Sequence, residues 1–234
     1  AAGNTHNNSL EYASNYGFCW SSTLITATYP LPAYGVCFGE DVVSRSYYDR
    51  YFGLSVRGVC KNPSKQHEMY VWQNGGKTTF VVADVDSVTF GKENTPPATG
   101  TENGYEWVDL GLSVKWATCN VGATKPEEYG DYFAWGEVEP KDYYDWSNYK
   151  WCKGTYLTKT KYCTNPSSAY DSIVDNKTTL ELIDDAAHVN WGGKWRMPNN
   201  TELTELRELC TWTKSSQNGV EGYKVTSNKS GYTD

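Results

Sequence analysis

Apolar and polar residues alternate over short stretches near the start of the chain, which is the period of a β-strand. The clearest examples are residues 34–38 (YGVCF) and 55–59 (SVRGV), and we expect a short strand at each. Residues 1–19 are rich in Asn, Ser and Tyr and show little periodicity, so they are expected to be mostly loop. In the segment 20–60, residues typical of a structural framework alternate with positions that carry side chains of many chemical types.

Two β-hairpins are predicted further along the chain. Residues 69–90 alternate on both sides of Asn74-Gly75, a pair that accepts the positive φ of a tight turn, and a third strand is expected at 87–90. Polar segments at 61–67 and 91–104 flank this hairpin and are typical of linkers. Residues 107–120 (WVDLGLSVKWATCN) predict a second hairpin with its turn at 109–111. A strand is also expected at 223–226, after glycine-containing breaks at 218–219 and 222.

Two helices are indicated by their start signals. Thr178 with Glu181 three residues later forms a capping-box pattern, so a helix is expected from there through 186–187 to Gly192-Gly193. A second helix is expected after Pro198, with Asn199 as its cap and Glu202 three residues on. The spacing places Leu203, Leu206 and Cys210 on one face of that helix. Short strands, two helices and much loop together indicate the α+β class.

Composition excludes some partners. The chain of 234 residues has 21 Lys and Arg against 28 Asp and Glu, a formal net charge of -7. This balance lacks the basic surface that nucleic acids or anionic membranes attract, and no apolar run approaches the roughly 20 residues of a membrane span. Aromatic residues make up 15% of the chain, which favours short strands and loops pinned by large rings. The abrupt ends suggest an excerpt of a longer polypeptide.

Seven cysteines occur without a C-x-x-C pair, which argues against zinc-ribbon and thioredoxin-type sites. Cys152 and Cys163 bracket a short loop and are the first candidates for a disulfide in an oxidising compartment. The alternative, that all seven are reduced and buried, stays open. The three histidines are isolated in sequence, and no Ser-His-Asp, P-loop or H-E-x-x-H pattern is present.

Residues 127–145 carry seven acidic residues against one lysine, interleaved with aromatic rings. One interpretation is a solvated loop that covers buried aromatic residues. The other is a calcium site, because hard cations require several oxygen ligands. The spacing alone does not decide between them.

Three motifs resemble those of a known family. They are WVDLGLSVKWA at 107–117, GDYFAWGE at 130–137 and WGGKWRMPxxxEL at 191–203. Together they are similar to the Fibrobacter-type major paralogous domain, found on surface proteins of Bacteroidetes-like bacteria. The resemblance covers roughly 104–226 and implies a C-type lectin-like fold, related to that of formylglycine-generating enzymes.

The opening segment resembles the other half of the same family. AAG at 1–3, CWSS at 19–22 and LSVRGVC at 54–60 match motifs that come late in the family's members, with departures at Cys19, Leu54 and Gly58. The family's order is therefore reversed: 1–60 corresponds to its C-terminal half, 61–103 to a linker with the hairpin 69–90, and 104–234 to its N-terminal half. The two halves are expected to dock as a circular permutant, which is tolerated where native termini lie close together.

Some similar lectin-fold proteins are the variable proteins of diversity-generating retroelements, in which adenine-directed mutagenesis rewrites Asn codons. The residue types that such rewriting yields occupy the irregular positions of the opening segment, which are therefore expected to form a variable binding surface. Tyr47, Tyr48 and Phe52 are expected to be exposed there, whereas Tyr51 is expected in the core. The expected binding positions are Ile25, Ala27, Leu31, Gly35, Cys37, Gly39, Val42, Ser44, Ser46, Tyr47, Tyr48, Asp49 and Phe52.

These resemblances imply a non-enzymatic recognition or adhesion module with no cofactor, calcium being the one candidate. Its expected ligand is a protein or glycan on another cell or host surface, and its expected location is extracytoplasmic, at the cell surface or secreted. One alternative is calcium-dependent sugar binding, but Glu139-Pro140-Lys141 and Trp146-Ser147-Asn148 match the lectin loops poorly. The other is an oxidase of the formylglycine-generating type, for which Cys37 and Cys60 do not lie in the required motif.

Overall fold

The computed structural model describes residues 4–6, 9–11, 16–26, 31–39, 42–61, 68–73, 76–81, 99–230 and 232. Its helices and strands follow in chain order. They are β1 (Asn4–His6), β2 (Ser9–Glu11), β3 (Tyr16–Leu24), β4 (Ala33–Gly39), β5 (Val42–Tyr48), β6 (Leu54–Ser55), β7 (Val59–Lys61), β8 (Glu68–Gln73), β9 (Gly76–Val81), β10 (Thr99–Glu102), β11 (Tyr105–Val108), β12 (Val114–Ala117), β13 (Tyr132–Phe133), η1 (Trp146–Asn148), η2 (Pro166–Ser168), η3 (Leu182–Asp184), α1 (Ala186–Trp191), β14 (Trp195–Arg196), α2 (Asn200–Leu209), β15 (Cys210–Gln217) and β16 (Val220–Ser227).

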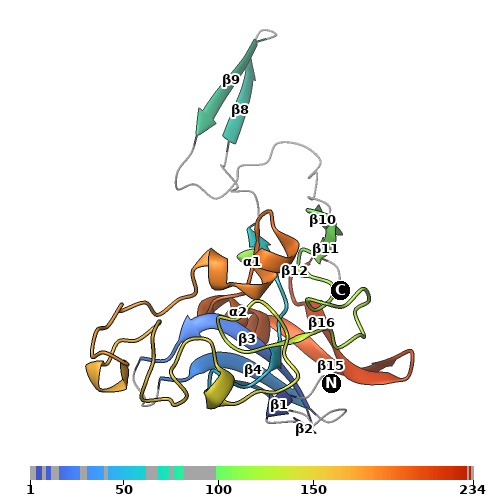
Figure 1. Cartoon of the computed structure of the whole chain (residues 1–234). Coiled ribbons are helices and arrows are strands. Elements are labelled where there is room, and N and C mark those ends of the chain that lie inside the picture. Colours follow the sequence, from blue (N-terminus) through green and yellow to red (C-terminus); the bar gives the residue numbers. More distant parts are fainter. Residues whose placement is uncertain are drawn as a thin grey trace.

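Two five-stranded sheets organise the described residues, in the orders β13-β6-β3-β4-β5 and β10-β11-β12-β7-β14. Three further strand pairs, β1–β2, β8–β9 and β15–β16, form two-stranded sheets. α2 lies over β3 and β4, and the β15–β16 hairpin extends beside them (Figure 1). The α+β class is therefore confirmed.

Segments 1–60 and 104–234 build both five-stranded sheets together, with β10 (Thr99–Glu102) added from the segment between them. β7 lies between β12 and β14, with Cys60 opposite both Lys115 and Trp195. β6 pairs with β13, so Leu54 lies opposite Phe133. The largest apolar core also draws on both segments, because Trp20, Trp135 and Trp195 are all fully buried in it. The two segments thus fold as one unit in which neither supplies a complete five-stranded sheet by itself.

Several sequence expectations are confirmed. The hairpin at 69–90 forms as β8 and β9, although its turn and the expected third strand at 87–90 lie outside the described residues. The hairpin at 107–120 forms as β11 and β12, with Trp107 opposite Ala117. α2 begins after Asn199 with the expected capping box, in which Asn199 and Glu202 each accept a backbone N–H of the other. Leu203 and Leu206 are buried on its inner face.

The first predicted helix was placed wrongly at its start. The backbone at 178–180 pairs with β3 instead: Leu24 N–H donates to Thr178 O at 2.8 Å and Leu180 N–H to Ser22 O at 3.0 Å. This pairing removes the backbone groups that a helix start would need. The α-helix α1 begins only after Asp185, whose side chain accepts the His188 N–H.

Other segments predicted as loop form strands. Within 1–19, the residues Asn4–His6 and Ser9–Glu11 pair as β1 and β2, and β3 begins at Tyr16. Thr99–Glu102, expected in a connector, pairs along β11 as β10. The predicted strand at 55–59 is divided instead, because β6 and β7 belong to different sheets and residues 56–58 cross between them. Distant partners explain only the last difference, because β13 pairs with β6 while β12 and β14 pair with β7.

The cysteines form no disulfide. All seven are free thiols, and six of them are buried. The Cys152 thiol donates to Trp146 O at 3.1 Å, and the Cys163 thiol donates to Asn165 O at 3.2 Å. The candidate disulfide between these two cysteines is therefore absent, and each thiol instead donates to a backbone carbonyl close in sequence.

Candidate functional site

The edge of the first sheet carries most of the expected binding positions. β4 and β5 are antiparallel, with Tyr34 opposite Tyr47, Val36 opposite Arg45 and Phe38 opposite Val43. Because side chains alternate across a strand, these six share one face of the sheet. Toward β3 this face is covered by α2 and the β15–β16 hairpin. At its other end it is open to solvent.

We call the residues Tyr34, Arg45 and Tyr47 the edge patch. Tyr47 is 59% exposed, the guanidinium of Arg45 lies 5.1 Å from the centre of the Tyr34 ring, and Arg45 is exposed. Cation–π contact orients the arginine, and the sheet holds the three backbones. Only Tyr47 was among the expected positions. The signal that could have found Tyr34 and Arg45 is the strand register, which the sequence does not provide.

The expected binding positions differ in how deeply they are buried. Val42 and Tyr47 are exposed, and Ala27 lies outside the described residues. The half-buried positions are Cys37, Ser44, Ser46, Tyr48, Asp49 and Phe52. The buried positions are Ile25, Leu31, Gly35 and Gly39. A ligand can reach the first group directly, whereas the last group shapes the sheet beneath it.

Two of the three rings expected to be exposed are partly in the core. Tyr48 packs edge-on to Phe18 and Trp20, with ring centres 5.5 and 6.0 Å away, and its burial raises the pKa of its phenol. Phe52 stacks on Tyr51 with ring centres 4.8 Å apart. The expected exposure of Tyr48 and Phe52 is therefore wrong, because both point toward neighbouring aromatic rings. Tyr51 is buried, as expected.

Gly35 has a steric reason to be glycine. A Cβ at this position would lie 2.9 Å from the carbonyl oxygen of Cys19 and 3.2 Å from the Tyr48 ring. The strands β3 and β4 approach closely here. Variation at Gly35 would therefore change the sheet rather than a contact surface.

A pocket of about 440 Å³ opens on the same face of the first sheet, beside the edge patch. Its apolar wall includes Phe38 of β4, Leu206 of α2, and Trp212 and Tyr223 of the β15–β16 hairpin. Phe38 contacts both hairpin rings, with ring centres 5.6 Å from Trp212 and 6.0 Å from Tyr223. The hairpin therefore forms one side of the pocket. Cavities of this size accommodate small organic ligands.

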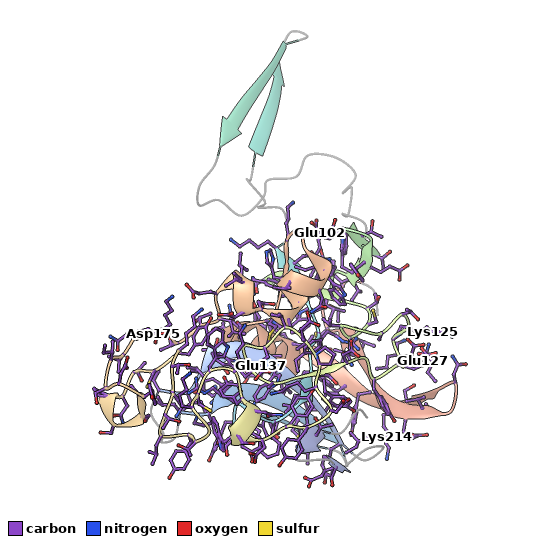
Figure 2. All side chains as sticks on the ribbon, in the orientation of Figure 1. Glu102, Lys125, Glu127, Glu137, Asp175 and Lys214 are labelled. Atoms are coloured by element: carbon purple, nitrogen blue, oxygen red, sulfur yellow. The ribbon has the colours of Figure 1, made fainter. Side chains whose placement is uncertain are left out.

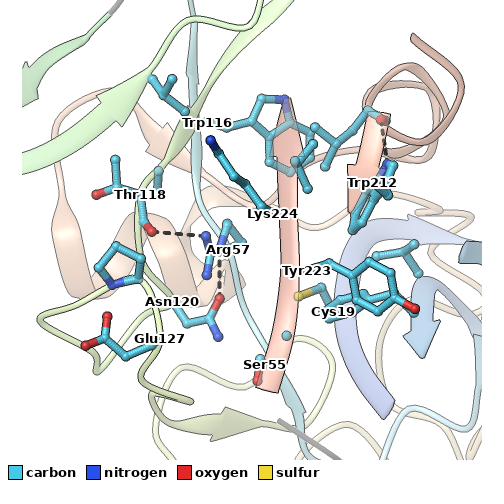
Figure 3. Close-up of a pocket in the computed structure, with 18 of the residues that line it drawn as sticks. Cys19, Ser55, Arg57, Trp116, Thr118, Asn120, Glu127, Trp212, Tyr223 and Lys224 are labelled. Carbon is cyan, nitrogen blue, oxygen red and sulfur yellow. Dashed lines mark hydrogen bonds between the residues drawn. The ribbon is translucent and has the colours of Figure 1, made fainter. Parts of the chain in front are cut away.

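Two cationic side chains line this pocket, Arg57 and Lys224 of β16 (Figure 3). Arg57 lies in the crossing segment between β6 and β7. Its Nε donates to Asn120 Oδ1 at 2.8 Å and its Nη1 donates to Thr118 O at 3.1 Å. Burial lowers the pKa of the guanidinium, which remains far above neutral pH. Arg57 is not among the binding positions expected from the sequence.

Two acidic residues that line the pocket, Glu127 and Glu128, have partners other than Arg57, although Oε2 of Glu127 is buried without a hydrogen-bond partner among the described residues. Glu127 Oε1 accepts a hydrogen bond from Asn218 Nδ2 at 2.6 Å, which lowers the pKa of Glu127. Glu128 Oε2 accepts the Thr124 N–H at 2.7 Å and the Thr124 hydroxyl at 3.0 Å, and these bonds lower its pKa. Both carboxylates are therefore ionised; Glu128 is held by its own loop and Glu127 by the turn of the β15–β16 hairpin.

The acidic side chains of the segment 127–145 do not gather at one site. Glu137 and Glu127 lie far apart in Figure 2, and each has its own partner. Glu137 pairs with Lys141 at 3.0 Å, and Asp145 caps η1 through the Ser147 N–H. Within the part of the chain that the structure describes, no group of three or more His, Cys, Asp or Glu side chains is placed to hold a metal ion.

A pair of buried cations lies away from the pocket. Arg50 is fully buried, donates from Nη1 to Tyr162 O at 3.1 Å, and has no hydrogen-bond partner among the described residues for Nε or Nη2. Lys159 is 1% exposed and donates to Tyr156 O at 2.5 Å. Burial, with the positive charge of Arg50, lowers the pKa of Lys159 to about 8. The lowered pKa of Lys159 makes the stability of the folded chain depend on pH.

The lowered pKa of a catalytic thiol is not found at Cys19, Cys37 or Cys60. Burial raises the pKa of Cys60 and of Cys19 to about 11 and also raises that of Cys37. Because their pKa is raised, these thiols stay protonated at neutral pH, whereas a reactive cysteine requires a lowered pKa.

His188 Nδ1 lies 2.9 Å from the Trp195 carbonyl oxygen, a contact that ties α1 to β14.

Comparisons with protein-family models, with curated proteins and with solved structures found no significant match to this chain. Over the described residues, neither α1 nor α2 has the length and apolar character of a helix that crosses a membrane. Function is therefore inferred from the geometry of the edge patch and the pocket.

Proposed function

We propose that the chain is a non-enzymatic ligand-binding module of an extracytoplasmic bacterial protein. The observation that carries the proposal is the edge patch, in which Tyr47 is 59% exposed beside the Arg45–Tyr34 cation–π pair. Tyr and Arg provide large contact areas and are enriched at sites that dominate binding energy. Two adjacent strands hold them, so little conformational entropy is lost when a ligand binds.

The resemblance of the three motifs to a surface-protein domain supports the finer parts of the proposal. In these parts, the scaffold is of the C-type lectin kind and is assembled as a circular permutant. Its ligand is a protein or glycan on another cell or host surface. Exposed positions of β5 vary between copies, with Val42 and Tyr47 as the most accessible of those expected from the sequence.

The experiment is a binding screen of the intact chain against a glycan array and a panel of purified cell-surface proteins. The hit is then tested with the double variant Arg45→Ala, Tyr47→Ala. Tyr170→Ala is the matched control, because Tyr170 is 60% exposed and lies outside the edge patch. We expect at least a tenfold loss of affinity for the double variant and no change for the control. Equal affinities for the two variants would contradict the proposal.

Tyr48 and Phe52 are not suitable for this test. Both contact core rings, so their truncation would lower stability and binding together. A parallel measurement with a chelator separates calcium-dependent sugar binding from the proposed contact. Loss of the glycan hit on chelation, without an effect of the double variant, would favour the calcium alternative.

A further inference from the structure

We propose that the pocket between the first sheet and the β15–β16 hairpin binds a small carboxylic acid with an aromatic or aliphatic body. In this site the carboxylate is held by Arg57 and the body lies against the apolar wall. The site is separate from the edge patch, and it goes beyond the recognition function proposed above. Its tests also use different residues.

The hydrogen-bonding capacity of Arg57 is only partly used within the protein. Nε and Nη1 donate to Asn120 and Thr118, and Nη2 makes no hydrogen bond to a described residue. The two existing bonds fix the plane of the guanidinium (Figure 3). A guanidinium that is already fixed in its plane can donate its remaining N–H groups to a carboxylate at little further entropic cost.

The charge of Arg57 has no counter-ion among the described residues. Its partners are an amide oxygen and a carbonyl oxygen, and no carboxylate forms an ion pair with it there. The groups that act on its charge are the thiols of Cys19 and Cys119, which are neutral at pH 7 because burial raises their pKa values. A partly desolvated cation without an opposite charge is unfavourable, and an anionic ligand would relieve this cost.

The walls determine the kind of anion. Phe38, Leu206, Trp212 and Tyr223 present apolar surface around the cavity of about 440 Å³. A small inorganic anion would leave this surface in contact with water, whereas an aryl or alkyl body would cover it. Trp116 also lines the pocket, and its Nε1 is buried without a hydrogen-bond partner among the described residues.

The nearby acidic residues do not neutralise this site. Glu127 is half-buried and Glu128 is exposed, and their printed partners are Asn218 and the Thr124 turn. Glu128 faces water and is screened, so its repulsion of an anion at Arg57 is small. Glu127 has one carboxylate oxygen that is buried without a hydrogen-bond partner among the described residues, and the two charges together disfavour polyanions. The structure thus favours a monocarboxylate over a phosphate ester or nucleotide.

The test uses the purified full chain with 4-phenylbutyrate and indole-3-acetate, each compared with its uncharged amide. Calorimetry gives the affinities. We expect each acid to bind at least tenfold more tightly than its amide. Arg57→Gln should remove this difference, while Arg207→Gln, an arginine of α2 outside the pocket lining, should leave it unchanged.

A measurement on the wild-type protein covers the case in which Arg57→Gln fails to fold. The indole N–H resonances of Trp116 and Trp212 should shift on addition of either acid, because both rings line the pocket. Those of Trp20 and Trp135, which donate to backbone carbonyls in the core, should not shift. Absence of binding by both acids, equal binding of acid and amide, or shifts confined to the core indoles would each overturn the proposal. None of these outcomes bears on the edge patch.

Discussion

The indole N–H of Trp20 donates to the backbone carbonyl of Phe133 at 2.7 Å, across 113 residues of sequence. A second bond runs in the opposite direction, from the indole of Trp135 to the carbonyl of Ser21 at 2.8 Å. Both indoles are fully buried. This reciprocal pair fastens the opening segment to the later one at the centre of the core. The exposed edge of the first sheet is therefore supported by residues from both.

Trp20→Phe is expected to lower the free energy of unfolding by about 2–4 kcal/mol, because it leaves the Phe133 carbonyl without its donor and opens a cavity. Urea denaturation measures this change. Trp146→Phe is the matched control, since Trp146 is only half-buried and its indole nitrogen has no hydrogen bond to a described residue. Similar losses in the two variants would contradict the role assigned to the Trp20 bond.

Glu202→Gln is expected to destabilise the chain by about 2–3 kcal/mol, because hydrogen bonds to charged groups are the stronger ones. Arg196 donates to both oxygens of Glu202, at 2.8 and 2.5 Å, and Glu202 is buried. Glu208→Gln provides the control, because the Arg207–Glu208 pair is exposed and should change stability by less than about 0.5 kcal/mol. Thermal or urea unfolding of the two variants decides the matter.

The stability of the chain should contain a contribution from Lys159 that depends on pH. Its pKa is about 8 when folded and close to 10.5 when unfolded, so the unfolded chain binds more protons between these values and stability rises with pH. Lys159→Met removes this contribution. The stability advantage of Met over Lys should therefore shrink by about 2 kcal/mol between pH 7 and pH 9.5.

Comparing the two proteins at each pH is necessary because the raised thiol pKa values act in the opposite direction. In those groups the folded chain binds more protons, so stability falls with rising pH. Their contribution is common to wild type and Lys159→Met and cancels in the difference. A difference that stays constant from pH 7 to pH 9.5 would show that Lys159 titrates normally.

Gly35→Ala is expected to cost about 1–3 kcal/mol, because the new Cβ would collide with the Cys19 carbonyl oxygen. Gly222→Ala is the control: it lies in β16, and a Cβ there meets nothing within 4 Å. Urea unfolding distinguishes them. If copies of this segment vary, Gly35 should stay constant while Val42 and Tyr47 change; frequent substitution at Gly35 would contradict this division.

The sequence by itself determined the local elements whose signals lie within a few residues. The capping box at Asn199 and Glu202 gives α2 its start, and the alternation of 107–120 around its glycine turn gives the β11–β12 hairpin. These succeed because the partners are neighbours in the chain and no distant strand takes up the same backbone groups. The same local rule failed at Thr178, where pairing with β3 replaced the expected helix start.

Only the tertiary structure decided which rings face solvent and which charges meet. Tyr47 and Tyr48 are adjacent, yet the first is 59% exposed and the second packs on Trp20, because the sheet has one core face at that point. Arg57 is not an expected binding position, yet the crossing between two sheets places it beside Thr118, Asn120 and an apolar pocket. Both outcomes depend on strand register and on contacts between the two segments, which no local pattern of residues encodes.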